Sequence, residues 1–382
     1  MKATAGLEVF GDSDVAATPR VAAWAIALAM FDQHDPAGMP VDPLGDDDFH
    51  ELVSLVENHR LLGALVEAVE SGQFPVSEGQ LGRIRERHRN WSLNVLKVER
   101  LLMKVTDRFE SAGIEFRIVK GVALAHTVYD DPTWRVFADV DLLIRSHQID
   151  RAVDLVTNSL GGQRTVAELR PGFDREFGKE AMLVIDGMEL DVHRTLVSGP
   201  FGLTVDVDEL MAGGADLEVG DRTLTTLGPA SRYLSACYNL ALGDYPVRLG
   251  AVRDLFLIDR LGDVDVATIT DIARRWQASA VVCRAANLMS ELQGGTPSPT
   301  LRQLAELQVP TRERVALRTY LTPTRSYRRQ VASLLVIPGV RPRLRYLRAL
   351  VTPSGDYLAS RGWTERSHVR RAARRLAGKP DD

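Results

Sequence analysis

Cysteine is nearly absent from this chain of 382 residues, which contains only two. Cys237 and Cys283 lie in apolar, helix-patterned stretches without the spacing of a metal site, so the sequence excludes a disulfide framework and predicts reduced packing residues of a cytoplasmic protein. Long apolar runs are missing too: the longest late one, residues 332–340, is broken by Pro338-Gly339. No signal-peptide pattern opens the chain, and we expect a soluble protein without a transmembrane segment.

Acidic residues are scarce only towards the C-terminus. From residue 301 onward 18 Lys and Arg stand against 6 Asp and Glu, a net +12, whereas the whole chain carries −4, so that residues 1–300 carry −16. This asymmetry predicts either intramolecular docking of the basic part or an arm that binds a polyanion. A basic amphipathic helix is expected around Arg370, Arg371, Arg374 and Arg375. A solvated tail is the alternative.

The chain up to Gly113 is predicted to be helical. A short apolar helix is expected over 21–31, and a helical period runs from Leu52 to Val69 behind a cluster of acids. A long helix follows a turn and cap that end at Ser77, and Gly113 stops it. Its expected apolar side consists of Leu93, Leu96, Leu101, Leu102, Val105 and Phe109.

Beyond Gly113 the patterns alternate between strand and helix, which is typical of an α/β unit. The expected order is strand, helix, strand, helix at 114–119, 122–129, 138–144 and 147–160. Asp186-Gly187 between two strand-like runs predicts a two-residue hairpin, and helices return after Pro229. We expect an α+β protein with a small mixed β-sheet flanked by helical regions, divided into 1–112, 113–228, 229–335 and a basic segment 336–382.

Two carboxylates share one face of the strand 138–144. The side-chain period of a strand is two, so Asp139 and Asp141 lie one pleat apart, roughly 6–7 Å. A solvated edge strand explains them, and so does a divalent cation bound between them. Asp191 is a third strand carboxylate, on the second arm of the predicted hairpin, with His193 on the same face. Three such carboxylates suit two Mg²⁺ ions, and the third can help to deprotonate an attacking hydroxyl.

Phosphate-binding groups are also present near these acids. Lys120-Gly121 ends a strand and opens a helix, and exposed amides beside a residue without a side chain can cradle a phosphate. Arg135 precedes Asp139 by four residues and can bind a phosphate bidentately. The alternatives are that Lys120 is a solvated strand end, that Arg135 neutralises Asp130 or Asp131, and that His193 bonds to a backbone carbonyl.

Together these residues resemble the polymerase-β-type nucleotidyltransferase superfamily, in particular its bacterial branch of largely uncharacterised members. The resemblance spans about residues 50 to 350 and rests on Lys120-Gly121, Tyr129, Arg135, Asp139-Val140-Asp141-Leu142-Leu143 and Leu190-Asp191-Val192-His193. It implies a nucleotidyltransferase core at 113–228, with two metals on Asp139 and Asp141 and with Asp191 as the third carboxylate. The stretch 248–259 resembles the helix with an Arg and an Asp near the nucleotide. A structural pair of Arg253 and Asp254 is the favoured alternative.

One position departs from the superfamily, because Val122 stands where a serine usually holds a nucleotide phosphate. Lys120 and the amides after Gly121 would have to substitute. The expected function is Mg²⁺-dependent transfer, with Mn²⁺ as a possible substitute, of a nucleotidyl group from an NTP donor such as ATP to a hydroxyl acceptor: a small molecule, a peptide or a protein. The alternatives are a transferase using another phosphate donor and a non-catalytic protein that binds RNA or a protein partner through its basic segment.

Overall fold

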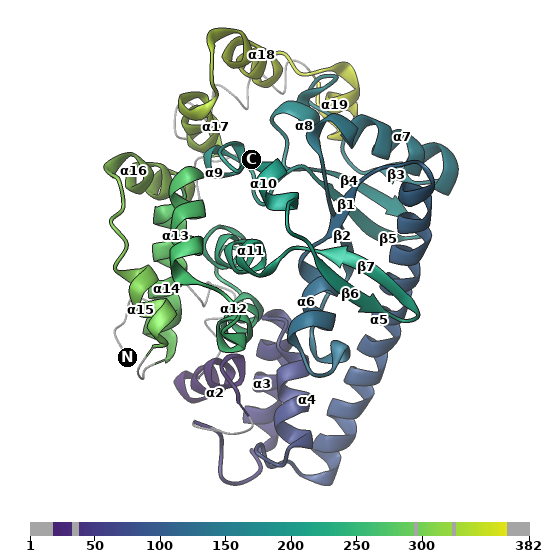
Figure 1. Ribbon diagram of the computed structural model, residues 1–382. Helices are drawn as coiled ribbons and strands as arrows, with labels where there is room; N and C mark the ends of the chain where they lie inside the picture. Colours follow the sequence, from purple (N-terminus) through teal and green to yellow (C-terminus); the bar gives the residue numbers. More distant parts are fainter. Residues whose placement is uncertain (1–17, 33–37, 294–296, 323–325, 365–382) are drawn as a thin grey trace.

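The computed structural model describes residues 18–32, 38–293, 297–322 and 326–364 (Figure 1). Within these ranges one mixed sheet of seven strands is flanked by helices, which confirms the expected α+β class. The strands lie in the order β3-β4-β5-β2-β1-β7-β6. Their bounds are β1 Phe116–Ile118, β2 Asp139–Ile144, β3 Gln163–Arg164, β4 Glu180–Ile185, β5 Met188–His193, β6 Ala215–Val219 and β7 Arg222–Thr226.

The strand that carries Asp139 and Asp141 lies inside the sheet. β2 pairs in parallel with β5 on one side and antiparallel with β1 on the other. All of its residues after Asp139 are buried. The interpretation of a solvated edge strand is therefore wrong. An alternation of charged and apolar residues is the same whether the charged face meets solvent or a polar site inside the protein, so the pattern alone could not decide between them.

The hairpin between β4 and β5 forms as predicted. Asp186 and Gly187 have φ angles of 51° and 79°, and two successive positive φ values produce the tight turn that matches the twist of paired strands. The two-residue turn fixes the register, in which Ile185 pairs with Met188 and Glu180 pairs with His193. The strands therefore extend their pairing from the turn to the far end of β5.

Helices precede, follow and connect the strands. The N-terminal ones are α2 Pro19–Ala29, α3 Asp46–Asn58, α4 Leu62–Glu70 and α5 Glu78–Ser111. Those within or after the sheet are α6 Lys120–Val128, α7 Ile149–Leu160, α8 Phe173–Glu176, α9 Pro200–Leu203, α10 Val207–Met211, α11 Pro229–Leu242, α12 Leu249–Leu261, α13 Val266–Arg275, α14 Ser279–Gln293, α15 Pro299–Ala305 and α16 Thr311–Tyr320, with 3-10 turns at η2 Pro132–Trp134 and η3 Ser146–Gln148. The last are α17 Ser326–Val336, α18 Val340–Val351 and α19 Gly355–Ser360.

The continuous helical period expected from Leu52 to Val69 is broken between α3 and α4. Arg60 has a φ of 59°, a left-handed conformation that a right-handed helix cannot include. The backbone N–H of Gly250, on α12, donates to the carbonyl oxygen of His59 at 2.9 Å. A helix distant in sequence thus provides the hydrogen bond for a carbonyl group at the break. The apolar period of the sequence does not predict this hydrogen bond.

The long helix α5 begins as expected, with a capping box between Ser77 and Gln80. Its apolar face differs from the expected one, because Leu93 and Leu96 are exposed. The buried apolar positions in its second half follow spacings of three and four residues and comprise Val95, Val98, Leu101, Leu102, Val105 and Phe109. At 100° per residue the two leucines point away from that stripe, so their assignment to the apolar side was wrong.

Two apolar clusters hold the fold together. One lies around the sheet, where the second half of α5, helix α7 and the strands bury their side chains together. The other joins residues that are far apart in the chain, because α2, α3 and α4 share it with α11, α12, α13 and α14. The N-terminal and C-terminal helices therefore pack into one continuous cluster.

The described part of the basic segment contacts α8, the short helix before β4. The ring of Tyr346 on α18 stacks on Phe173 with 5.8 Å between centroids, and Arg345 lies 2.9 Å from Glu176. The helix expected around Arg370 to Arg375 lies outside the described residues. Among those described, no helix combines the length and the apolar character that crossing a membrane requires.

Candidate functional site

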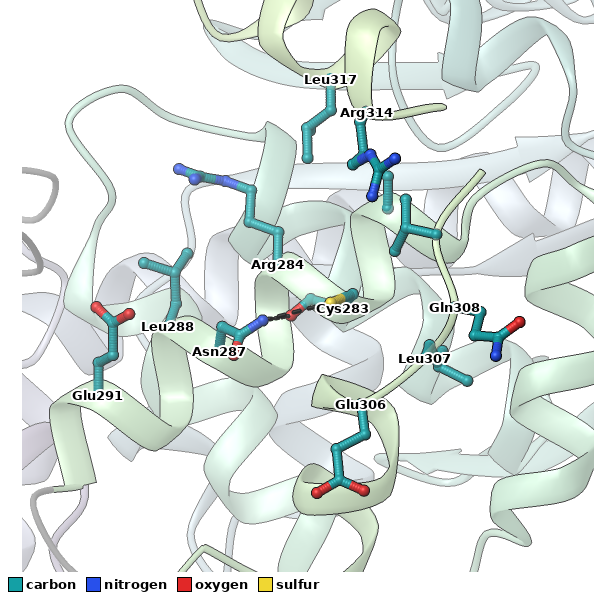
Figure 2. Close-up of a pocket in the computed structure, with 12 residues that line it drawn as sticks. Cys283, Arg284, Asn287, Leu288, Glu291, Glu306, Leu307, Gln308, Arg314 and Leu317 are labelled. Atoms are coloured by element: carbon teal, nitrogen blue, oxygen red, sulfur yellow. Dashed lines mark hydrogen bonds between the residues drawn. The ribbon is translucent and has the colours of Figure 1, made fainter. Parts of the chain in front are cut away.

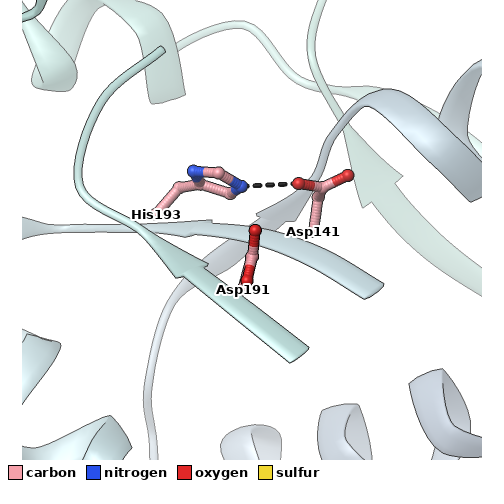
Figure 3. A group of neighbouring side chains, drawn as sticks. All are labelled: Asp141, Asp191 and His193. Atoms are coloured by element: carbon pink, nitrogen blue, oxygen red, sulfur yellow. Dashed lines mark hydrogen bonds and ion pairs between the residues drawn. The ribbon is translucent and has the colours of Figure 1, made fainter. Parts of the chain in front are cut away.

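Three of the predicted site residues meet where β2 and β5 run side by side. The parallel register places Asp141 opposite Asp191, and His193 follows one pleat later on β5. One ligand atom from each of Asp141, Asp191 and His193 lies within 4.8 Å of the others. Figure 3 shows the histidine ring and the two carboxylates gathered over the strands. The arrangement brings together two oxygen donors and one nitrogen donor, which is sufficient for part of a cation's coordination shell.

Lys120 adds a positive charge to this group. It is the first residue of α6 and has a φ of 51°. Its Nζ lies 2.8 Å from Oδ1 of Asp141 and 3.2 Å from Nε2 of His193. Gly121 lets α6 approach β2, because a Cβ at this position would lie 3.3 Å from the Cβ of Phe137. The Lys120 ammonium therefore supplies the positive charge beside the Asp141 carboxylate in this structure.

Asp141 and Asp191 have opposite electrostatic environments. Burial opposes ionisation of Asp141, but Lys120 and His193 outweigh it and lower the pKa of that carboxyl far below its usual range. Burial, followed by repulsion from Glu180, raises the pKa of Asp191 to about 6. Oδ1 of Asp191 is buried and has no hydrogen-bond partner among the described residues. Such an oxygen is costly unless a ligand or a proton satisfies it.

Glu180 is a member of the site that the sequence analysis missed. Its Oε2 lies 3.0 Å from Nδ1 of His193 and 2.5 Å from Nζ of Lys179. Burial opposes its ionisation, yet the contacts with His193 and Lys179 lower the pKa of Glu180 to about 2. The signal was available, because counting back from the Asp186-Gly187 turn pairs Glu180 with His193.

Asp139 lies one pleat before Asp141 and outside the three-residue group. Its side chain is only partly buried at the start of β2. Burial and the negative charge of Asp141 raise its pKa, while Lys120, Arg60 and Arg135 act in the opposite direction. Asp139 therefore interacts electrostatically with the group and is more exposed than Asp141.

Arg135 is engaged in a separate, fully paired network. Its Nε and Nη2 donate to the two carboxylate oxygens of Asp254 at 2.9 and 2.8 Å, and the Tyr129 hydroxyl donates to Oδ1 at 2.8 Å. Asp254 therefore does not pair with Arg253, and that structural pair is corrected: Arg253 instead pairs with Glu67. Arg253 and Asp254 are adjacent in the sequence, but Asp254 pairs with Arg135 and Arg253 pairs with Glu67.

Arg60 was not singled out from the sequence. It is exposed in its left-handed conformation, and its charge reaches Asp139. A Cβ on Gly250 would lie 3.2 Å from the Cβ of Arg60, so the glycine allows α12 to approach this strained residue. Both the break and the approach depend on tertiary contacts.

A large cavity lies elsewhere in the molecule. It has a volume of about 770 Å³ between α14 and the segment that joins α15 to α16 (Figure 2). Arg284, Arg314, Glu291 and Glu306 line it, together with Cys283. None of its lining residues belongs to the carboxylate group, so the cavity contributes nothing to that site.

A mixed sheet with flanking helices, carboxylates on adjacent central strands and a lysine at the start of a helix are the features that the resemblance to nucleotidyltransferases implied. Residues 45–294, well over half of the chain, match the family described as "Uncharacterised nucleotidyltransferase", and the chain belongs to that family. The resemblance noted in the sequence is thereby confirmed. A comparison with curated proteins finds no match.

Proposed function

We propose that the protein is a Mg²⁺-dependent nucleotidyltransferase that moves an NMP group from an NTP to a hydroxyl acceptor. The observation that carries the proposal is the convergence of Asp141, Asp191 and His193 on the paired strands β2 and β5. The family supports nucleotidyl transfer in general. The free cysteines Cys237 and Cys283 fit a reducing, cytoplasmic setting.

The residues present fit a divalent cation. Asp141 and Asp191 supply the hard oxygen ligands that Mg²⁺ prefers, and the unpartnered Oδ1 of Asp191 is an oxygen in need of a ligand. His193 supplies nitrogen, which suits Mn²⁺ better than Mg²⁺. Asp139, which is more exposed than Asp141, would contribute to a second ion. Such ions, when bound, neutralise charge on the phosphates and lower the pKa of a bound hydroxyl.

Lys120, Gly121 and Arg60 would hold the triphosphate. A cation bound by Asp141 would replace the Lys120 ammonium electrostatically, which leaves Nζ available for a phosphate oxygen. Amides at the start of α6, after Gly121, point away from the helix and suit an anion. Arg60 is the exposed guanidinium near Asp139, whereas Arg135 contributes its charge while it remains paired with Asp254.

The reaction requires one proton acceptor. The acceptor hydroxyl oxygen forms a bond to the α-phosphorus, the bond from that phosphorus to the bridging oxygen breaks, and pyrophosphate leaves. We assign acceptance of the hydroxyl proton to the Asp191 carboxylate, which lies opposite Asp141 in the register of β2 and β5 and therefore beside the proposed cation. The Glu180 carboxylate, 3.0 Å from Nδ1 of His193, places a negative charge beside that ring.

Label transfer tests the proposal. Each α-labelled NTP is incubated with the protein, Mg²⁺ or Mn²⁺, and cell extract as the source of acceptor. We expect labelled product with at least one NTP, and Asp141→Asn should lower its rate roughly a hundredfold or more, because the interaction lost is worth several kcal/mol. Asp216→Asn, an exposed acid on β6, is the matched control. Label transfer that is unaffected by Asp141→Asn, or absent with every NTP, would contradict the proposal.

The division of the chain remains part of this proposal. We assign catalysis to residues 113–228 and structural support to the helical regions 1–112 and 229–335. The described contacts of α18 with α8 support intramolecular docking of the basic segment 336–382 over polyanion binding through its whole length.

A further inference from the structure

The helix α18 has two apolar faces, and only one of them is covered. Tyr346 and Ala349 are buried, and the Tyr346 ring contacts Phe173 and Phe177. A second stripe lies on the opposite side at spacings of four, three and four residues, which place its members within one narrow sector of the helix. The exposed fractions of its members are Val340 70%, Leu344 59%, Leu347 39% and Val351 64%. The stripe therefore faces outward.

Arginines border this stripe on both sides. At 100° per residue Arg341 and Arg348 lie along one edge of it and Arg343 along the other. All three are exposed, and α18 contains no acidic residue. Arg341 and Arg348 have no ion pair or side-chain hydrogen bond with any described residue. An apolar stripe between cationic edges is complementary to a surface with apolar depth and negative charge.

We propose that α18 binds an anionic lipid bilayer, with its apolar stripe between the acyl chains and its arginines at the phosphate level. Long guanidinium side chains can reach lipid phosphates while their stems cover apolar surface. The inference concerns where the protein resides and does not depend on the proposed transferase activity.

Charge argues against the other occupants of the stripe. Residues 365–382 carry six Lys and Arg against three Asp and Glu, so this tail and α18 repel each other. A second copy of α18 would place arginines against arginines across a symmetric interface. Anionic lipid is the partner whose charge opposes that of the helix.

The fold presents the helix in a fixed orientation. Arg345 pairs with Glu176, the Arg170 side chain donates to Thr352, and the Ser354 N–H donates to the Leu169 carbonyl oxygen at 2.7 Å. These contacts tie α18 and the start of α19 to α8 and to the loop that precedes it. Because the helix is already folded and held, binding would not have to supply the free energy of ordering it.

Vesicle sedimentation with the full chain tests the proposal. We expect the protein to pellet with vesicles of phosphatidylcholine and phosphatidylglycerol, and not with phosphatidylcholine alone. Leu344→Gln combined with Leu347→Gln should weaken this binding roughly tenfold or more, since each leucine loses its apolar transfer into the bilayer. Arg341→Gln with Arg348→Gln should weaken it by a similar factor and reduce its dependence on salt.

Matched substitutions on α5 are the controls. Leu93→Gln with Leu96→Gln removes two exposed leucines from another helix, and Arg85→Gln with Arg89→Gln removes two exposed arginines. Both controls should bind vesicles like the unaltered chain, and circular dichroism should show that every variant is folded.

Three results would overturn the proposal. The first is no binding to anionic vesicles. The second is binding that survives the Leu344 and Leu347 changes but is lost when residues 365–382 are deleted. The third is a dimer in sedimentation velocity that these leucine changes dissociate, which would assign the stripe to a second copy.

Discussion

Two buried groups of charge, one around Asp254 and one around Asp191, differ in how completely they are matched. Asp254 receives both arms of Arg135 and the Tyr129 hydroxyl. Asp191 has a buried oxygen without a partner among the described residues. A buried carboxylate oxygen without a partner costs stability unless a ligand or a proton satisfies it, whereas a fully paired carboxylate avoids that cost. The contrast favours Asp191 over Asp254 as the proposed ligand-binding acid.

The largest effect is expected from breaking the paired group. Arg135→Ala leaves Asp254 buried and uncompensated, and should lower the free energy of unfolding by about 3–5 kcal/mol. Chemical denaturation measures this. Lys104→Ala, which breaks the exposed ion pair with Asp186, should cost no more than about 1 kcal/mol. Equal losses for the two variants would remove the distinction between the groups.

A bound metal ion should provide the partner that the Asp191 carboxylate lacks and should thereby stabilise the folded protein. Mg²⁺ or Mn²⁺ should raise the melting temperature by mass action, with about 2.7 kcal/mol gained at a hundredfold excess over Kd. Asp141→Asn and Asp191→Asn should each abolish the rise, and Asp139→Asn should leave part of it. Differential scanning fluorimetry with a metal titration measures the effect. A rise that survives the Asp139→Asn, Asp141→Asn double change would exclude these two carboxylates as ligands.

The positively charged side chains of the site, Lys120 and Arg60, should contribute to the affinity for the NTP donor. Lys120→Ala should weaken binding of the Mg-NTP complex by about 1.5–3 kcal/mol, the range for a hydrogen bond to a charged group. Arg60→Ala should have a smaller effect in the same direction, because this side chain is exposed. Isothermal titration calorimetry gives both values, with Arg89→Ala on α5 as a control. An unchanged Kd for Lys120→Ala would place the donor elsewhere.

The last prediction concerns the dependence of stability on pH. The folded pKa of Asp191 is about 6, above its value in an unfolded chain, so its ionised form destabilises the metal-free protein above pH 6. This penalty is relieved as pH falls through 6 towards 4. Asp191→Asn should therefore raise the melting temperature at neutral pH, and the gain should vanish near pH 4. Asp216→Asn should show no such trend, and a gain independent of pH would contradict the assigned cause.

Local patterns predicted the strands and the turn that position the site. The alternation around Asp139 and Asp141 located β2, and Asp186-Gly187 located the hairpin that presents Asp191 and His193. These features depend on neighbours within a few residues, for which a period of two and a two-residue turn are strong constraints. The same register would have identified Glu180.

Pairings between distant segments could not be predicted in this way. Arg135 and Asp254 lie 119 positions apart, and no local pattern links them. The break at Arg60 requires α12 to be in place, because Gly250 bonds to His59. Such features depend on how the helices close around the sheet, and that closure is a property of the whole chain.

The cluster that unites α2, α3 and α4 with α11 to α14 has a consequence for synthesis of the chain. The N-terminal helices leave the ribosome first, but their apolar partners follow only after more than half of the chain has been made. Contacts of such long sequence separation form late and slowly. Nascent α2 to α4 would therefore expose their apolar faces while the sheet folds, and chaperones that hold apolar helices would be expected to bind there during translation.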